Sequence, residues 1–100
     1  DFNCRTDEPP IKALLEYGLI ESRDNATVRT SKYRSHHAYP TYYPELDTYK
    51  DGVMPNLEPH KSIDHIFTYG TVTTLTYHTV VDSESLEATD HCPIYIDVKF

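Results

Sequence analysis

The sequence predicts a mixed α/β domain of the α+β type, with mostly antiparallel strands and one short helix. Two observations lead to this prediction. A single amphipathic stretch lies near the start of the chain, whereas the last 40 or so residues contain apolar runs and a two-residue alternation typical of strands. The length of 100 residues allows one domain at most.

The expected helix spans residues 8–17. Two prolines fit its first turn, apolar residues follow at positions i, i+3 and i+4 from Ile11, and Gly18 marks its end. Residues 21–62 are rich in turn-forming types but also hold five tyrosines, which predicts a long folded loop beside a site rather than a disordered segment.

Three strands are expected after this loop, over residues 63–69, 72–81 and 94–100. The first is a short apolar run, and the second is rich in Thr, Val and Tyr. In the third, apolar and polar residues alternate, which predicts a strand with one buried and one solvated face.

Composition excludes several classes of protein. Nine Lys and Arg against 16 Asp and Glu give a net charge of −7, which disfavours a non-specific nucleic-acid coat protein. No run approaches the roughly 18 apolar residues of a spanning helix, so no transmembrane segment is expected. Cys4 and Cys92 allow one disulfide at most, and reduced thiols that pack near a site are the preferred interpretation.

Three acidic motifs carry the candidate chemistry: Asp-Phe-Asn at residues 1–3, Ser-Ile-Asp-His-Ile at 62–66 and Thr-Asp-His-Cys-Pro-Ile at 89–94. Each alone is compatible with an ordinary turn or edge strand. In this combination and order, the chain resembles the endonuclease/exonuclease/phosphatase superfamily over nearly its whole length. Thr48-Tyr49 is similar to a Thr-aromatic pair that the family often carries before its later motifs.

The resemblance implies a role for each of five polar residues. Asp1 matches the aspartate that orients or activates the attacking water and also lies near the metal, and Asn3 matches the asparagine that binds the scissile phosphate. Asp90 matches a metal-associated aspartate. His91 resembles the histidine that contacts the phosphate and has acid-base roles, and Asp64 resembles the carboxylate that orients this histidine.

The resemblance also implies an architecture. Residues 1–100 would be the C-terminal half of a four-layer α/β/β/α sandwich, with the N-terminal half absent. The exposed sheet would then need that half, or a second chain, to cover it, and these residues alone would be inactive. Thr89 stands where the family usually has Ser, a change that keeps the hydroxyl.

A physical argument about charge accompanies the resemblance. If Asp1, Asp64 and Asp90 converge, two carboxylates about 5 Å apart repel by roughly 3 kcal/mol at an effective dielectric constant of 20. Either a pKa rises or a divalent cation neutralises the cluster. Oxygen ligands with a phosphorylated substrate favour Mg²⁺, with Mn²⁺ next, over Zn²⁺, which prefers several His or Cys ligands.

The substrate class stays broad at this point: a phosphorylated lipid, an inositol phosphate, a small phosphodiester or a nucleic acid. Lys61 either steers the phosphate or is an ordinary solvated lysine. Two other functions remain open. One is a non-catalytic binding or structural half-domain. The other is a transition-metal binder, which requires convergence of several of four histidines: His36, His37, His60 and His65.

Overall fold

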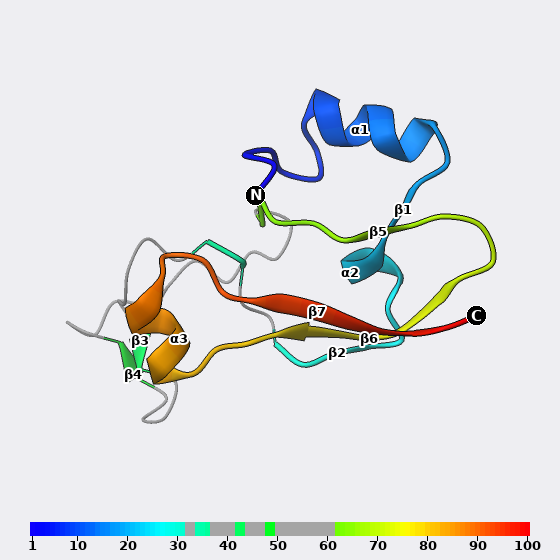
Figure 1. Ribbon diagram of the computed structural model, residues 1–100. Helices are drawn as coiled ribbons and strands as arrows, with labels where there is room; N and C mark the ends of the chain where they lie inside the picture. The colour runs from blue at the N-terminus through cyan, green and yellow to red at the C-terminus, as the bar shows by residue number, and fades with distance from the viewer. Residues whose placement is uncertain (32–33, 37–41, 44–47, 50–61) are drawn as a thin grey trace.

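The structure is a computed structural model that describes residues 1–31, 34–36, 42–43, 48–49 and 62–100 (Figure 1). It confirms the α+β class. The helices are α1 Pro9–Glu16, α2 Ser22–Asn25 and α3 Ser83–Ala88. The strands are β1 Ile20–Glu21, β2 Val28–Arg29, β3 Tyr42–Tyr43, β4 Thr48–Tyr49, β5 Phe67–Thr68, β6 Thr73–Thr79 and β7 Ile94–Lys99. No helix in this described part is long and apolar enough to cross a membrane.

The largest described sheet has the strand order β2-β6-β7. Strand β6 pairs antiparallel with β7 and parallel with β2, while β1–β5 and β3–β4 form two further antiparallel pairs. In Figure 1, α1 lies beyond the β1–β5 pair, on the side away from the large sheet, and α3 connects β6 to β7 at one end of the molecule. The prediction of mostly antiparallel strands is thus confirmed.

Helix α1 forms where the sequence predicts it. Its first two residues are prolines, whose missing N–H groups cost nothing in the first turn. Ile11 is fully buried. Gly18 takes φ = 109°, a left-handed conformation that ends the helix and directs the chain into β1.

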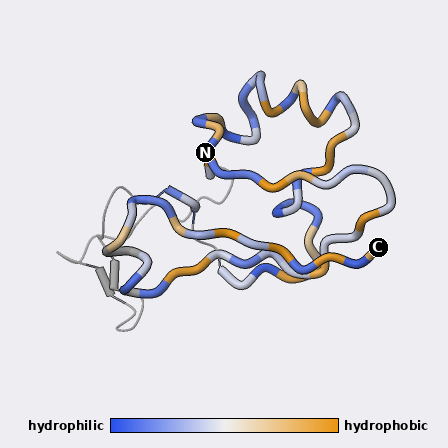
Figure 2. The backbone as a smooth tube through the Cα atoms, in the orientation of Figure 1, coloured by the Kyte–Doolittle hydropathy of each residue, from blue (hydrophilic) through white to orange (hydrophobic). Residues whose placement is uncertain are grey.

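The alternation of the last strand is also confirmed. Along β7, the apolar residues from Ile94 to Val98 are partly covered, whereas the polar residues between them and Tyr95 are exposed. Figure 2 shows this alternation of hydropathy along the strand. Strand β6 lies within the predicted range 72–81. The strand expected at 63–69 is shorter, because only Phe67–Thr68 pairs with β1.

The expectation of one helix and of a long loop without strands or helices over residues 21–62 is wrong for the described residues, although Ser35 and His36 of this stretch do lie beside the candidate site. Helix α2 and strands β1 to β4 use residues of this stretch, and α3 adds a third helix. Both extra helices begin at an acidic N-cap: the side chain of Glu21 accepts from Asp24 N at 2.8 Å, and that of Asp82 accepts from Ser85 N at 2.7 Å. Helices of four and six residues are too short to show a clear apolar period.

The buried part of the described chain is mixed in polarity. Tyr77 on β6 is 1% exposed, and the guanidinium of Arg23 from α2 lies 5.4 Å from the centre of its ring. Burial, with a contribution from the charge of Glu21, raises the pKa of Tyr77 to about 12. Helix α2 therefore packs on β6 through an aromatic ring and a buried cation rather than through aliphatic side chains.

Both cysteines are free thiols, as expected. Cys92 is buried, and this burial raises its thiol pKa to about 11. Cys92 is therefore protonated at neutral pH and acts as a small apolar residue, next to the third acidic motif.

Candidate active site

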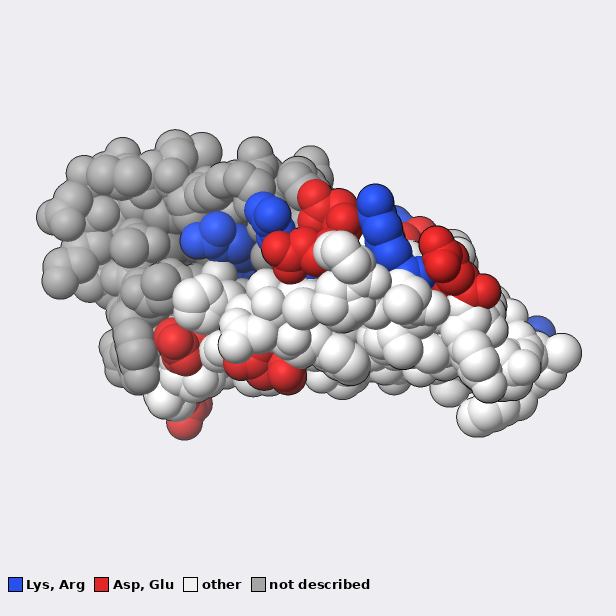
Figure 3. Space-filling model, turned by 90° about the horizontal axis from the view of Figure 1, so that it is seen from above, with Lys and Arg blue, Asp and Glu red and all other residues white. Residues whose placement is uncertain are grey.

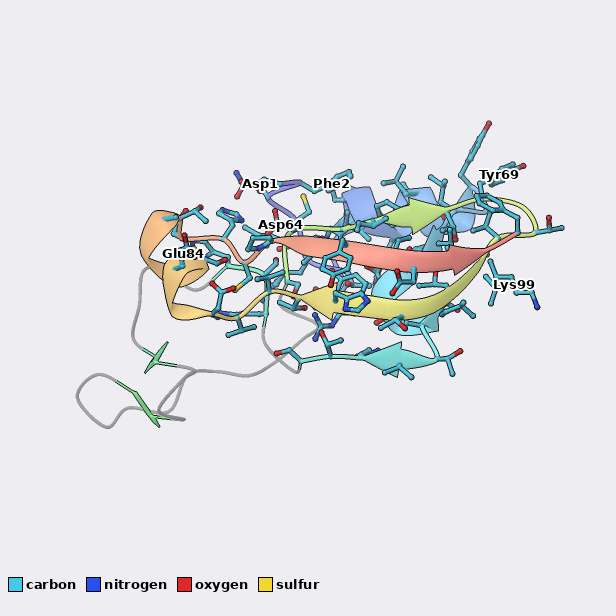
Figure 4. The ribbon with its side chains drawn as sticks, turned by 60° about the horizontal axis from the view of Figure 1, so that its bottom comes forward. Asp1, Phe2, Asp64, Tyr69, Glu84 and Lys99 are labelled. Atoms are coloured by element: carbon cyan, nitrogen blue, oxygen red, sulfur yellow. The ribbon has the colours of Figure 1, made fainter. Side chains whose placement is uncertain are left out.

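The candidate site lies where three segments meet at the end of the molecule that holds α3. These segments are residues 1–3, 62–64 and 90–92. Figure 4 shows Asp1 and Asp64 near the start of β7, whereas Tyr69 and Lys99 mark the opposite end. The backbone N–H of Phe2 donates to the carbonyl of Ile63 at 2.9 Å, which joins the first acidic motif to the second.

Ser35 fixes the relative positions of two of these segments. Its side chain is fully buried, and its Oγ accepts from the backbone N–H groups of Ile63 and Asp64, both at 3.1 Å. Its own N–H donates to Ser62 Oγ at 3.0 Å, and its carbonyl accepts from Cys92 N at 2.6 Å. The second and third motifs are therefore tied to one residue that no sequence pattern singled out.

Asp64 and His91 form the hydrogen-bonded pair that the resemblance implies. Oδ2 of Asp64 lies 2.7 Å from Nδ1 of His91. An ionised carboxylate only accepts, so Nδ1 carries the proton, and Nε2 faces the opposite side of the ring. Both side chains are partly shielded, with exposed fractions of 15% for Asp64 and 26% for His91.

The environment keeps Asp64 ionised. Burial alone would raise its pKa, but hydrogen bonds from the Ser35 hydroxyl and the His91 ring, together with the charge of His91, outweigh burial and hold the pKa below its usual range. The carboxylate is therefore available at neutral pH to orient the imidazole.

Two more carboxylates lie on the Nε2 side of the imidazole. Nε2 of His91 is 3.7 Å from Oδ2 of Asp1 and 3.9 Å from Oδ1 of Asp90. The Asp1 carboxylate is held by the backbone N–H of Asn3, which donates to its Oδ1 at 2.8 Å. Asn3 has φ = 54°, a left-handed conformation that asparagine adopts more readily than most residues.

His36 joins this group, although the motifs did not point to it as a neighbour of His91. Its Nε2 lies 3.2 Å from Oδ2 of Asp90, and its ring centre lies 4.9 Å from that of His91. The backbones of the two histidines form an isolated antiparallel β-bridge. The adjacency arises from pairing between distant segments, which leaves no local sequence signal.

Two carboxylates near His91 are candidate ligands for a divalent cation. Asp1 and Asp90 supply carboxylate oxygens on one side of His91, and these side chains are 49% and 40% exposed, which leaves room for water ligands. Mg²⁺ is usually bound by one or two carboxylates and keeps several waters. Among the described residues, Asp90 groups with His36 and His91 within 4.8 Å, whereas Asp1 approaches only His91 of these three, at 3.7 Å.

Other predicted residues lie elsewhere. His65 is directed away from the site: its Nε2 lies 2.7 Å from the carbonyl oxygen of Cys4, and its Nδ1 lies 3.6 Å from Oε1 of Glu21. Among the described residues, His36 groups with Asp90 and His91 rather than with His65. Lys61, His37 and His60 lie outside the described residues.

No protein-family model matches the sequence, and no curated protein matches it significantly. Two solved structures are similar in fold. One is a conserved protein of unknown function from Enterococcus faecalis V583, with a TM-score of 0.67 and 19% identity over 99% of this chain. The other is a mannosyl-6-phosphatase from Bacteroides thetaiotaomicron VPI-5482, with a TM-score of 0.64 and 18% identity over 100% of this chain.

At these identities the likeness concerns the fold. The chain covers 34% of the Enterococcus protein and 36% of the Bacteroides phosphatase, so it spans about a third of the length of each. The described residues thus have the fold of one part of two larger proteins, one of which is a phosphatase.

Proposed function

We propose that this chain contributes the acidic part of a divalent-metal-dependent phosphoesterase, which hydrolyses a phosphate ester with water. The main support is the arrangement around one imidazole: Asp64 lies on Nδ1, while Asp1 and Asp90 flank Nε2. A histidine oriented by one carboxylate and facing two others combines a proton-transfer group with a cation-binding group.

Each residue has a distinct role in this proposal. Asp1 accepts a hydrogen bond from the water that attacks phosphorus, and the Asn3 side chain binds a phosphoryl oxygen. The new P–O bond forms as the bond to the leaving oxygen breaks. Asp1 takes the proton that the attacking water loses, and protonated His91 gives its Nε2 proton to the leaving oxygen, while Asp64 keeps the ring in place. A divalent cation at Asp90 and Asp1, when bound, supplies positive charge to the phosphoryl oxygens.

A small phosphate ester or a phosphorylated lipid fits this chain better than a long nucleic acid. The net charge of −7 opposes a polyanion. Figure 3 shows acidic and basic side chains interspersed along one edge of the face seen from above, beside a larger uncharged area, so the described residues on that face form no continuous basic track. Because one structural neighbour is a mannosyl-6-phosphatase, sugar phosphates are the first substrates to try.

The test is a hydrolysis panel on a longer protein that contains this chain, with sugar phosphates, inositol phosphates, sphingomyelin and DNA, each with Mg²⁺ and with chelator. We expect Mg²⁺-dependent turnover that falls by about 10²- to 10⁴-fold in His91→Ala. The matched control is His78→Ala on β6, whose ring stacks on Tyr95 at 4.0 Å. Equal turnover in wild type and His91→Ala, with folding intact, would remove His91 from the mechanism.

The panel also separates the proposed enzyme from a binding module. Saturable binding of a phosphorylated ligand, without hydrolysis under any metal condition, would identify the chain as part of a non-catalytic binding domain. Turnover that survives complete chelation would contradict the role of the cation.

A further inference from the structure

A second metal-binding possibility involves nitrogen ligands. His36, Asp90 and His91 each offer one ligand atom, and these three atoms lie within 4.8 Å of one another. Nε2 of His36 is 3.2 Å from Oδ2 of Asp90, and Nε2 of His91 is 3.9 Å from Oδ1 of the same carboxylate. All three side chains are partly exposed, so an ion can enter from solvent.

The spacing suits a tetrahedral transition-metal ion. Zn²⁺ binds imidazole nitrogen and carboxylate oxygen at about 2.0–2.2 Å, so the ligand atoms of one tetrahedral site lie about 3.4 Å apart. The observed separations differ from this value by amounts that small side-chain rotations can remove. Two imidazoles and one carboxylate favour Zn²⁺ over Mg²⁺, which prefers oxygen ligands.

The surroundings of His91 prepare its Nε2 as a ligand. Because Nδ1 carries the proton and donates a hydrogen bond to Asp64, the neutral ring presents the Nε2 lone pair on the side of Asp90. A carboxylate behind a ligating histidine is a common outer-shell arrangement in zinc sites, where it fixes the ring and raises its basicity. The backbone bridge between His36 and His91 keeps the backbones that carry the two ligands side by side.

We infer that His36, Asp90 and His91 form a Zn²⁺ site that overlaps the phosphoester site. The inference has a second part, which rests on the proposed function. Zn²⁺ on Nε2 of His91 occupies the atom that gives its proton to the leaving oxygen, so zinc binding and hydrolysis exclude each other. Zinc then acts as a reversible inhibitor of the Mg²⁺-dependent reaction.

Direct binding tests the first part without reference to activity. Zn²⁺ affinity is measured by competition with a chromogenic chelator in excess Mg²⁺, and Co²⁺ is used as a spectroscopic substitute. We expect His36→Gln to weaken Zn²⁺ binding by at least about 10-fold and Asp64→Asn to weaken it by about 10- to 100-fold, since outer-shell partners of zinc ligands have effects of this size. His78→Gln is the matched control and should bind as wild type.

Several outcomes would overturn the site. These are the absence of Zn²⁺ binding, equal affinity in wild type and His36→Gln, and a loss of affinity in His37→Gln or His60→Gln but not in His36→Gln. If circular dichroism shows that His36→Gln is unfolded, two other measurements test the site. These are the Zn²⁺ affinity of Asp64→Asn and the visible absorption bands of the wild type with bound Co²⁺. Featureless octahedral Co²⁺ bands would contradict tetrahedral ligation by the histidines.

Activity tests the second part separately. In excess Mg²⁺, added Zn²⁺ should lower turnover with the same concentration dependence as the binding curve. Zinc binding without any effect on turnover would overturn the exclusion. If a longer protein that contains this chain binds Zn²⁺ but hydrolyses none of the substrates, the zinc site stands and the proposed phosphoesterase is rejected.

Discussion

Ser35 anchors two motifs with one hydroxyl and two backbone groups. We predict that Ser35→Ala destabilises the fold because the N–H groups of Ile63 and Asp64 lose their acceptor. A buried donor without a partner costs about 1–3 kcal/mol. The pKa of Asp64 should also rise, since the Ser35 hydroxyl is one of the groups that lower it. Urea denaturation measures the stability, and NMR titration follows the carboxyl group.

The control for this variant is Thr71→Ala, at an exposed position. It removes a hydroxyl of similar polarity and should change the free energy of unfolding by less than about 0.5 kcal/mol. Equal stability of Ser35→Ala and the wild type would mean that water replaces the lost acceptor.

Asn3 combines a backbone role with its proposed phosphate-binding role, and two substitutions separate these roles. Asn3→Gly accepts φ = 54° freely, whereas Asn3→Ala is strained by about 1–2 kcal/mol there. Both variants lack the amide, so both should lose phosphoesterase turnover. Only the alanine variant should unfold at clearly lower urea concentration. Full turnover in Asn3→Gly would leave Asn3 with a backbone role alone.

The residue types of the site were predictable, but not all of its members. Asp1, Asp64 and His91 follow from short motifs, and the structure brings them together. Ser35 and His36 were not identified as their neighbours, because their contacts depend on pairing with segments more than 25 positions away. The members of a site assembled by such long-range contacts can be predicted from the sequence only where each segment also carries a local motif.

At the scale of elements, Glu21 links strand β1, helix α2 and the segment before β5. One carboxylate oxygen caps α2 at Asp24 N, and the other lies 3.6 Å from Nδ1 of His65. Burial would lower the pKa of His65, but the nearby carboxylate of Glu21 and the hydrogen bond to the Cys4 carbonyl raise it above the ordinary value of 6.5.

This shift predicts a dependence of stability on pH. A raised pKa in the folded state means that protonated His65 stabilises the fold. This contribution is complete below 6.5, the pKa that His65 has when unfolded, and disappears as the pH rises through the folded-state pKa. Urea midpoints should therefore fall as the pH rises above about 6.5. In His65→Gln the fall should be smaller, and an unchanged slope would contradict the assignment.

Asp64 acts in a different pH window. Its pKa lies below the ordinary value of 3.8, so its contribution to stability is complete above 3.8 and is lost as the pH falls through the folded-state pKa. The two groups can therefore be distinguished in one series of measurements, because Asp64 contributes on the acid side, where Asp64→Asn should reduce the loss of stability, and His65 contributes near neutrality.

Elements with a sustained period were predictable, whereas short capped ones were not. Helix α1 has apolar spacing and two prolines, and β7 alternates over six residues. Helices α2 and α3 depend on N-capping by Glu21 and Asp82, and such acidic residues are too common along this chain to mark a helix by themselves.

For the whole molecule, the described residues bury few apolar side chains. These are Ile11, Ala26, Tyr77 and Cys92, whereas Phe100, Tyr17 and Tyr69 are mostly exposed. We predict that the 100 residues expressed alone are marginally stable and hydrolyse no phosphate ester. The measurements are thermal unfolding and the hydrolysis panel, compared with a longer protein that contains this chain. Full activity of the isolated chain would contradict the expected need for a covering half or partner.

The β-bridge between His36 and His91 couples the positions of the two backbones that carry the imidazoles. They are attached to segments far apart in the chain, and the bridge brings the two backbones together. If that bridge opened, His91 and His36 would move apart together with their backbones. A metal ion bound by both imidazoles would instead stabilise the bridge and slow the local opening of the backbone.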